Sequence, residues 1–208
     1  MLGFYNYTVI LTYLGLVSSV MGIFLTFNGQ TEISVLCLMF SGFCDMFDGR
    51  VARTMERTKQ QKEFGIQIDS LADLVCFGVL PAVIGYSIGL RKWYQVLIPI
   101  VFVLAALIRL AYFNVMEEER QKTSNGARKV YEGLPVTSIA LIVPFIYILK
   151  NPVYKIGIEF HVFYGAVLFL VAVLYISKIK IKKPGIKAML VFLAIGVAEL
   201  AWLKMAGV

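Results

Sequence analysis

Long apolar runs, each close to the length that crosses a lipid bilayer, constrain this chain more than any other feature of its sequence. A membrane-spanning helix needs about 20 consecutive apolar residues. Seven segments have this character, at about 8–27, 32–55, 66–89, 93–115, 134–150, 158–177 and 187–206. The composition agrees, because 59% of the 208 residues are hydrophobic and only 16% are charged, against about 25% charged in soluble proteins. The sequence therefore predicts an all-α polytopic membrane protein that forms a single domain over 1–208.

Lysine and arginine are distributed unevenly between the two sides that these spans would separate. Fourteen of them fall at or after the ends of the second, fourth and sixth spans, and five fall on the other side. Cytoplasmic loops are enriched in Lys and Arg, so we expect the first set and the N-terminus to face the cytoplasm. The first span lacks the basic region and cleavage site of a signal peptide, so we expect it to be retained. The net charge of +7 is concentrated in these loops and predicts no nucleic-acid partner.

The stretch "DMFDGRVAR", residues 45–53, follows the apolar run "EISVLCLMFSGFC" with no loop between them. Charges therefore occupy the cytoplasmic half of the second span, although a charge near the bilayer centre costs at least about 2.5–3.5 kcal/mol. The third span repeats the pattern with "GIQIDSLAD". Asp45 and Asp48 are three residues apart, and Asp69 and Asp73 are four apart, so each pair occupies one helical face. Two adjacent antiparallel helices can thus bring all four aspartates of the chain to one depth.

Four carboxylates packed together repel one another and lose hydration, so their burial needs a reason. A structural salt-bridge cluster with Arg50 and Arg53 is one explanation. A site for hard cations is the other, because oxygen ligands without His or Cys select Mg²⁺, Mn²⁺ or Ca²⁺ over zinc or copper. Four aspartates can hold two such ions, an arrangement suited to clamping a phosphoryl group and its leaving oxygen. We favour the metal site.

Three small residues stand one helical turn from an aspartate: Gly49, Ala52 and Gly65. Each removes bulk beside a carboxylate and lets a ligand approach the backbone. The alternative is that Gly and Ala permit close helix packing. For Gly49 and Ala52, which are flanked by Asp and Arg, we favour the ligand.

Together the two stretches match the pattern D-x-x-D-G-x-x-A-R…G-x-x-x-D-x-x-x-D, with the eleven residues "TMERTKQQKEF" between them. This pattern resembles the signature of the CDP-alcohol phosphatidyltransferases, integral membrane enzymes of phospholipid synthesis, although the gap is longer than is commonest there. Three strings, "DSLADLVCFGVLPA", "RLAYFNV" and "YEGLPV", are similar to strings of the phosphatidylserine synthase branch, with Cys76 and Tyr112 as departures. The resemblance covers residues from about 8 to 150 and implies a six-helix catalytic core, about 1–178, plus an extra C-terminal transmembrane helix, about 187–206.

The resemblance implies a transferase that moves the phosphatidyl group of CDP-diacylglycerol to the hydroxyl of L-serine, giving phosphatidylserine and CMP. It also implies two divalent cations, Mg²⁺ or Mn²⁺. The first would be held by Asp45, Asp48 and Asp69. The second would be held by Asp45, Asp69 and Asp73, and Asp73 would also act as the general base. The residues implied to border the CDP-lipid are Gly49, Ala52, Arg53, Gly65, Asn6 and Thr8.

The acceptor site is less well defined by the sequence. Arg109, in the cytoplasmic half of the fourth span, is a candidate partner for the serine carboxylate or a phosphate, because a guanidinium offers a bidentate fork. The alternative is an arginine that extends its charge to the membrane interface. Further candidates for acceptor contacts are Asn114, Arg128, Lys129 and Glu132.

The same residues are compatible with two other functions. A sister enzyme could take glycerol 3-phosphate, inositol phosphate or choline, since the motif contacts only the shared CDP-lipid, but the branch-like strings favour serine. A cation transporter could also use an acidic site, but transporters often show repeated or broken helices, and the sequence has no second D-x-x-D segment. We expect a homodimer, by resemblance, among the lipids of a prokaryotic cell membrane, with its active site facing the cytoplasm.

Overall fold

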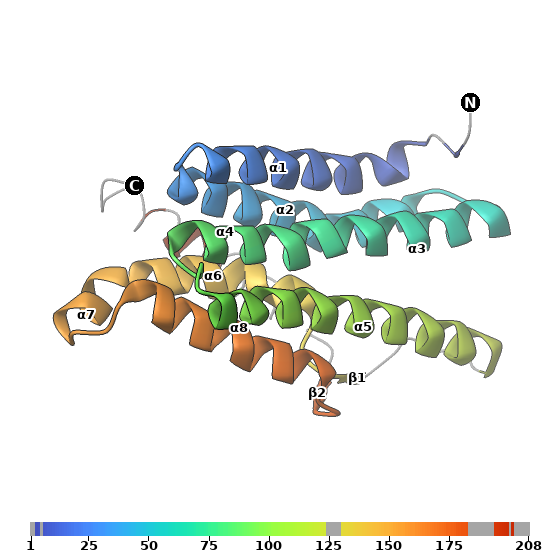
Figure 1. Ribbon diagram of the computed structural model, residues 1–208. Coiled ribbons are helices and arrows are strands. Elements are labelled where there is room, and N and C mark those ends of the chain that lie inside the picture. Colours follow the sequence, from blue (N-terminus) through green and yellow to red (C-terminus); the bar gives the residue numbers. More distant parts are fainter. Residues whose placement is uncertain (1–2, 5, 124–129, 183–193, 200, 202–208) are drawn as a thin grey trace.

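The helices lie side by side with their long axes roughly aligned, as in a bundle that crosses a bilayer (Figure 1). This computed structural model describes residues 3–4, 6–123, 130–182, 194–199 and 201. The predicted all-α polytopic fold is confirmed. Within the described ranges, the exceptions are two strands of three residues each, β1 (Val130–Glu132) and β2 (Lys180–Lys182), which pair antiparallel.

The N-terminal half contains the helices that carry the charged stretches. Their bounds are Tyr7–Val9 (a 3₁₀ turn), Ile10–Phe27 (α1), Thr31–Val51 (α2), Ala52–Thr54 (a 3₁₀ turn), Lys59–Asp73 (α3), Leu74–Val79 (a π-helix) and Leu80–Ile88 (α4). Helix α2 is unbroken through Asp45 and Asp48, so the charged stretch does belong to the helix. Its α-helical part ends at Val51 rather than at the predicted residue 55.

The second half of the chain completes the bundle. Its elements are Trp93–Thr123 (α5), β1, Val136–Ser138 (a 3₁₀ turn), Ile139–Ile148 (α6), Lys150–Lys155 (α7), Phe160–Ile176 (α8) and β2. Residues 194–199 are also helical. Most of the predicted seventh span, 187–206, lies outside the described residues.

Among the described residues, three helices are long and apolar enough to cross a membrane. They are Tyr7–Phe27, Lys59–Ile88 and Trp93–Arg120. The shorter apolar helices are Val136–Ile148 and Phe160–Ile176. Helix α2 has 21 residues, which is the length of a span, but it carries charged residues near both ends.

The predicted third span, 66–89, begins earlier, at Lys59. Thr58 caps this end: its Oγ1 accepts a hydrogen bond from the Gln61 N–H at 3.3 Å, and Gln61 Oε1 accepts one from the Thr58 N–H at 3.0 Å. Such a reciprocal cap satisfies two backbone donors at a helix start. The polar first turns of α3 therefore extend the apolar span at one end of the bundle.

The fourth and fifth spans also differ from the prediction in length. Helix α5 continues to Thr123 rather than ending near residue 115, because its last turns are rich in Glu, Arg and Lys, which are good helix formers. The fifth span, predicted at 134–150, starts as a 3₁₀ turn at Val136 and is interrupted at Leu149 before α7.

A π-helical stretch joins α3 to α4 directly after Asp73. Pro81, in the first turn of α4, has no N–H to donate, and a proline ring crowds the preceding turn of an α-helix. A locally widened turn is one way in which a helix accommodates such a residue without ending. The Pro81 carbonyl accepts a hydrogen bond from Tyr164 Oη at 2.9 Å, which attaches α4 to α8.

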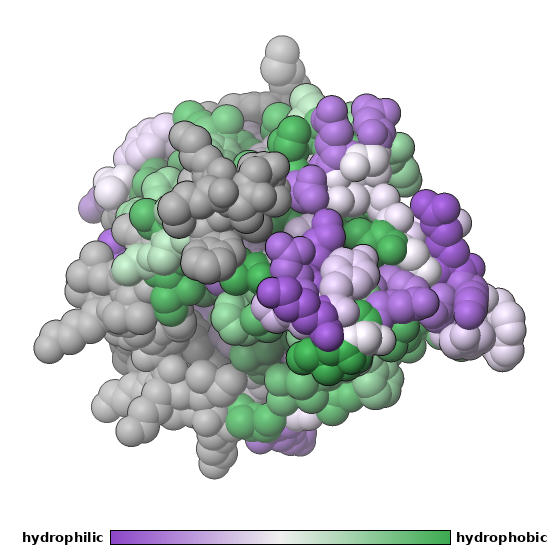
Figure 2. All heavy atoms as spheres, turned by 90° about the vertical axis from the view of Figure 1, so that its left-hand side faces the viewer, coloured by the Kyte–Doolittle hydropathy of each residue, from purple (hydrophilic) through white to green (hydrophobic). Residues whose placement is uncertain are grey.

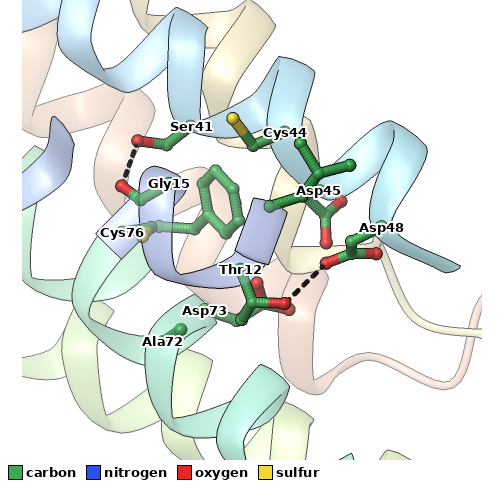
Figure 3. Close-up of a pocket in the computed structure, with 11 residues that line it drawn as sticks. Thr12, Gly15, Ser41, Cys44, Asp45, Asp48, Ala72, Asp73 and Cys76 are labelled. Atoms are coloured by element: carbon green, nitrogen blue, oxygen red, sulfur yellow. Dashed lines mark hydrogen bonds between the residues drawn. The ribbon is translucent and has the colours of Figure 1, made fainter. Parts of the chain in front are cut away.

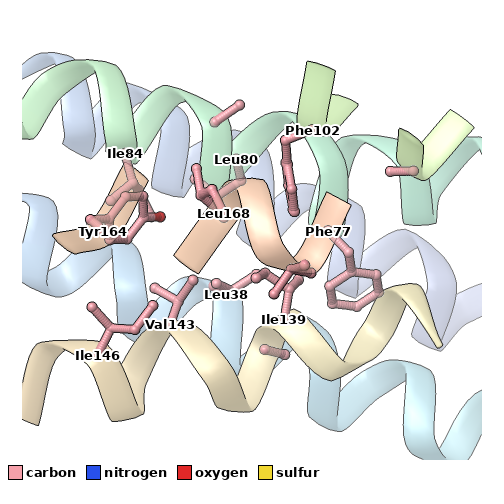
Figure 4. Packing of buried hydrophobic residues seen from close by; sticks show 14 of the residues in the cluster. Leu38, Phe77, Leu80, Ile84, Phe102, Ile139, Val143, Ile146, Tyr164 and Leu168 are labelled. Atoms are coloured by element: carbon pink, nitrogen blue, oxygen red, sulfur yellow. The ribbon is translucent and has the colours of Figure 1, made fainter. Parts of the chain in front are cut away.

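The apolar core lies between α2, α4, α5, α6 and α8 (Figure 4). Leu38, Leu80, Phe102, Ile139 and Leu168, one from each of these helices, are fully buried in it. Each buried aliphatic side chain adds dispersion contacts that no lipid chain matches in density. This packing fixes the axes of α2 and α4, and so constrains the helices that carry the aspartates.

Hydroxyl groups attach α1 to α2 along their length. Ser41 Oγ donates to the Gly15 carbonyl at 2.8 Å and lies 2.8 Å from Ser19 Oγ. Further along, Thr26 Oγ1 lies 2.7 Å from Ser34 Oγ. Small residues and short interhelical hydrogen bonds are the usual means by which helices associate inside a membrane.

Figure 2 views the bundle from the end formed by the α1–α2 turn, the α4–α5 turn and α7. Hydrophilic side chains gather on part of this end, beside apolar ones. Lys150 of α7 and Glu32 of α2 form an ion pair there, with Nζ 3.3 Å from Oε1. The aspartates of α2 lie toward the opposite end of the bundle.

Gly42 allows α2 to approach α6, since a Cβ placed on it would lie only 2.6 Å from the Ala140 Cβ. We expect Gly42→Ala to push these helices apart and to lower the free energy of unfolding by about 1–3 kcal/mol. Gly49→Ala is the matched control on the same helix, because a Cβ there meets no atom within 4 Å and Ala favours helix. Unfolding in mixed detergent micelles measures the free energy of unfolding of both variants. Equal stability of the two variants would contradict this account of the packing.

Candidate active site

Helices α2 and α3 each bring two aspartates to one place. Asp45 and Asp48 come from the last turns of α2, and Asp69 and Asp73 from the last turns of α3. One carboxylate oxygen from each of Asp45, Asp48 and Asp69 lies within 4.8 Å of the other two. All four aspartates are partly buried. The structure therefore brings together the residues that the sequence pattern singled out.

A small cavity of about 10 Å³ lies beside this cluster (Figure 3). Asp45, Asp48 and Asp73 line it, together with Thr12 and other residues of α1 and α2. A cavity of this volume has room for about one water molecule or ion. It lies where the α2 carboxylates face the end of α3.

The donor set and one orphaned atom fit a divalent cation. Oδ1 of Asp69 is buried and has no hydrogen-bond partner among the described residues, although buried acceptors are nearly always paired. Carboxylate oxygens are the ligands of Mg²⁺, Mn²⁺ and Ca²⁺. A cation among Asp45, Asp48 and Asp69 would supply the missing partner and remove the repulsion between these charges. These residues could hold a metal ion.

Thr12 of α1 contacts the cluster and was not predicted from the sequence. Its Oγ1 donates to Asp48 Oδ2 at 3.4 Å (Figure 3). Thr8 and Thr12 are spaced by one helical turn, and both are buried. This pair of polar residues on one face of a largely apolar segment is the sequence pattern from which Thr12 could have been predicted. Groups that hold ligating carboxylates in place commonly affect metal affinity.

Three glycine and alanine positions were predicted to leave room for a ligand. A Cβ on Gly49 would meet no atom within 4 Å, so this position is open. At Gly65 the space is already used, because Nη1 of Arg57 lies 3.1 Å from where a Cβ would be. Ala52 lines a larger cavity together with Arg57.

The predicted N-terminal contacts, Asn6 and Thr8, bond to each other. Asn6 Oδ1 accepts hydrogen bonds from the Thr8 N–H, at 3.2 Å, and from the Thr8 hydroxyl. This arrangement is an N-cap of the 3₁₀ turn that precedes α1. In this structure the two side chains therefore order the start of α1.

The predicted acceptor residues Arg109 and Asn114 join parts of the fold. Asn114 Nδ2 donates to Ser70 Oγ at 2.8 Å, which connects α5 to α3 beside Asp69. Arg109 is 6% exposed, and its Nε donates to the Leu134 carbonyl at 3.3 Å. Both residues thus have structural contacts that the sequence did not predict.

Gly133 explains why the segment after β1 approaches Arg109 so closely. Its φ of +78° lies in the region that favours glycine. A Cβ there would lie 2.8 Å from the Tyr175 carbonyl and 3.2 Å from Arg109 Nε. Tyr175 Oη donates to the Val136 carbonyl at 2.9 Å, which holds the same segment from α8.

Four predicted site residues cannot be placed in full. Arg128 and Lys129 lie outside the described residues. The backbones of Arg53 and Glu132 are described, in a 3₁₀ turn and in β1, but their side chains are not.

With this geometry in view, comparison with known proteins identifies the family. A family model for CDP-alcohol phosphatidyltransferase matches residues 5–177. This chain belongs to the CDP-alcohol phosphatidyltransferase family. The match includes α1 to α8 and ends before the C-terminal residues 194–199. The family recognised from the motif is confirmed.

Several curated relatives are similar to the chain over more than half of its length. The CDP-diacylglycerol--serine O-phosphatidyltransferase of Saccharomyces cerevisiae is 42% identical over 125 residues, which is 59% of this chain and 44% of the yeast protein. The archaetidylserine synthase of Methanothermobacter thermautotrophicus is 29% identical over 67% of this chain and 56% of its own. The CDP-diacylglycerol--serine O-phosphatidyltransferase of Helicobacter pylori strain 26695 is 29% identical over 77% of this chain and 65% of its own.

The matched part spans about half the length of the first two of these relatives. No solved structure matches the chain.

We expect Asp69→Asn to abolish stabilisation by Mn²⁺. In the wild-type protein, metal at 100 times its dissociation constant should add about 2.7 kcal/mol to the free energy of unfolding, and loss of Asp69 removes a shared ligand. Without metal, the variant should be at least as stable as wild type, because one buried charge is gone. Thermal unfolding with and without Mn²⁺ measures both effects.

Glu63→Gln on the same helix is the control for Asp69→Asn, because Glu63 is exposed and paired with Lys59 at 3.8 Å. Mn²⁺ should stabilise this variant as it does the wild-type protein. Full Mn²⁺ stabilisation of Asp69→Asn would exclude Asp69 as a ligand.

Thr12→Val should weaken Mn²⁺ binding by up to about tenfold, because Asp48 loses a group that orients it. Thr26→Val is the matched control, since Thr26 lies on the same helix, is buried, and bonds to Ser34 rather than to an aspartate. Mn²⁺ titration followed by electron paramagnetic resonance reports the affinity. Equal effects of the two substitutions would show that Thr12 has no specific role at the cluster.

Proposed function

We propose that this protein transfers the phosphatidyl group of CDP-diacylglycerol to the hydroxyl of L-serine, releasing CMP and phosphatidylserine. The observation that carries this proposal is the meeting of Asp45, Asp48 and Asp69 beside Asp73 on two helices. Family membership supports the CDP-lipid as donor. The names of the yeast and Helicobacter relatives support serine as acceptor.

Two divalent cations, Mg²⁺ or Mn²⁺, are proposed as cofactors. Asp45, Asp48 and Asp69 would hold one, and Asp45, Asp69 and Asp73 the other. When bound, the cations would neutralise the diphosphate of the donor and stabilise the CMP that leaves. The buried, unpartnered oxygen of Asp69 supports its place in both sets.

The remaining chemistry is assigned to Asp73. The serine hydroxyl oxygen attacks the phosphorus that carries the diacylglycerol, and the bond from that phosphorus to the CMP oxygen breaks. The hydroxyl proton passes to an Asp73 oxygen, since a carboxylate within hydrogen-bond reach is a competent general base. Buried Cys76 and Phe77 of the π-helical stretch line the same small cavity as Asp73, which supports a partly dry setting for this carboxylate.

The remaining donor contacts are proposed at Gly49, Ala52, Gly65 and Arg53. The openness of Gly49 supports the first of these. Asn6 and Thr8 are proposed to act indirectly, by ordering the start of α1 beside the site. Acceptor contacts are proposed for Arg109, Asn114, Arg128, Lys129 and Glu132.

The site is proposed to face the cytoplasm of a prokaryotic cell. The excess of Lys and Arg at the aspartate end supports this orientation. A catalytic core over about 1–178 is supported by the limits of the family match, 5–177.

An additional C-terminal span is proposed at about 187–206, of which residues 194–199 and 201 are described. A Cβ on Gly196 would lie 3.7 Å from Leu141 Cδ2 of α6. A homodimer is proposed by analogy with the family.

The decisive experiment follows CMP release by purified protein given CDP-diacylglycerol, Mn²⁺ or Mg²⁺ and one acceptor at a time. We expect release with L-serine and none above background with glycerol 3-phosphate, inositol phosphate or choline. Release with glycerol 3-phosphate and none with serine would overturn the acceptor while keeping the donor and the family.

Asp73→Asn should abolish CMP release but leave a folded protein that still binds one Mn²⁺ through the Asp45, Asp48 and Asp69 set. The amide cannot take the serine proton, whereas the first set of ligands is intact. Activity assay and Mn²⁺ stoichiometry on the same preparation test both parts. Retained turnover would exclude Asp73 as the general base.

A further inference from the structure

A cavity of about 480 Å³ lies at the end of α2 and the start of α3. It is lined by Ala52, Met55, Glu56, Arg57 and Lys62. Sites for small molecules commonly have volumes of about 300–1,000 Å³. This cavity is therefore far larger than a metal ion needs, and one of its lining residues, Ala52, stands one turn after Asp48.

Arg57 has a buried donor without an acceptor. Its Nε is buried and has no hydrogen-bond partner among the described residues. Its Nη1 lies 3.1 Å from the position of a Cβ on Gly65, so the guanidinium rests on α3 one turn before Asp69. An orphaned buried donor needs an explanation, and a ligand that supplies the acceptor is one.

The charges of the lining indicate what kind of acceptor this is. Arg57 and Lys62 are cations and Glu56 is the one anion among the five lining residues. A guanidinium binds phosphate oxygens through a planar fork of N–H groups, and an ammonium adds a point charge. A phosphate group that belongs to a larger molecule fits both the charges and the volume.

The segment that carries Arg57 is held in place from the N-terminal side. Tyr7 Oη lies 3.0 Å from Thr54 Oγ1, and the rings of Phe4 and Phe64 meet edge to face with their centres 5.5 Å apart. These contacts fix both ends of the connection between α2 and α3. Because the connection is already ordered, less conformational entropy is lost when a ligand binds there.

We propose that Arg57, with Lys62, binds a phosphate of the donor's nucleotide, which makes Arg57 a donor-binding residue outside the aspartate motif. The inference rests on the proposed function, because that function supplies the nucleotide diphosphate. The diphosphate has to reach the aspartates, and the cavity is the adjoining space in which its nucleotide end can lie. Arg57 belongs to "TMERTKQQKEF", the segment between the two halves of the aspartate motif, and its guanidinium lies beside Gly65.

The test is the binding of cytidine 5′-diphosphate to the purified full-length protein in nanodiscs of zwitterionic lipid with Mg²⁺, measured by calorimetry. We expect Arg57→Ala to weaken CDP binding by about 10- to 100-fold, the usual effect of losing a hydrogen bond to a charged group. Binding of cytidine, which has no phosphate, should not change. Arg57→Lys, which keeps the charge but loses the fork, should give a smaller loss.

Lys59→Ala is the matched control, because Lys59 is the first residue of α3, two positions after Arg57, is exposed, and pairs with Glu63 outside the cavity. It should bind CDP as the wild-type protein does. Mn²⁺ titration of each variant verifies that the aspartate cluster is intact, and Arg57→Lys serves if Arg57→Ala does not fold.

Three results would overturn the inference. One is unchanged CDP affinity in both Arg57 variants. Another is an equal loss of cytidine affinity, which would put the base rather than the phosphate on Arg57. The third is a loss seen only in nanodiscs with anionic lipid, which would assign Arg57 to a headgroup. If the Arg57 variants lose CDP affinity as expected but the wild-type protein releases no CMP with serine, the proposed function is refuted and this inference stands.

Discussion

The repulsion between carboxylates inside a helical bundle is the constraint on which the rest of the structure depends. Oxygens of Asp45, Asp48 and Asp69 lie within 4.8 Å of one another, and two unit charges 4 Å apart repel by about 4 kcal/mol at an effective dielectric constant of 20. A protein whose net stability is about 5–15 kcal/mol cannot leave several such pairs unbalanced. Bound cations would remove this repulsion, and the apolar core of the bundle holds the helices that carry the carboxylates in place.

That packing is distributed unevenly along the helices. Helix α1 lies against both α2 and α3, and it is attached to α2 through Ser41 and Gly15. At the other end, the core around Leu80 and Tyr164 holds α4, which continues α3. Buried Cys76 and Phe77 bring this packing up to one side of the carboxylates, while the cavity of about 480 Å³ leaves space at the end of α2 and the start of α3. Space at that end is what a site for ions and a phosphorylated ligand requires.

The sequence predicted the parts of this arrangement that follow from periodicity and charge. The spacing of Asp45, Asp48 and Asp69 was enough to place them on facing helices, because helical geometry is regular. It was not enough to predict that Arg109 binds the Leu134 carbonyl, since this contact depends on how α5 packs against a loop far along the chain. Nor could it predict Thr12, whose contact with Asp48 depends on the crossing of α1 and α2. The ends of α3 and α5 were predicted wrongly for a simpler reason. Hydropathy marks only the apolar part of a helix that lies in the membrane, whereas the helix itself continues through polar residues into water.

The polar extension of α3 has a consequence for how a membrane enzyme can recognise a water-soluble group. Because α3 begins at Lys59, its first turns lie beyond the apolar part of the span and Gly65 stands between the two. The guanidinium of Arg57, which precedes α3, uses the space that Gly65 leaves, so a cation lies against the polar turns of α3 and carboxylates stand in its later turns. A ligand that carries phosphates next to a lipid matches this order of charges along the helix axis. Under the proposed function, the same helix would set both the orientation of the donor and the depth at which its reacting phosphorus lies.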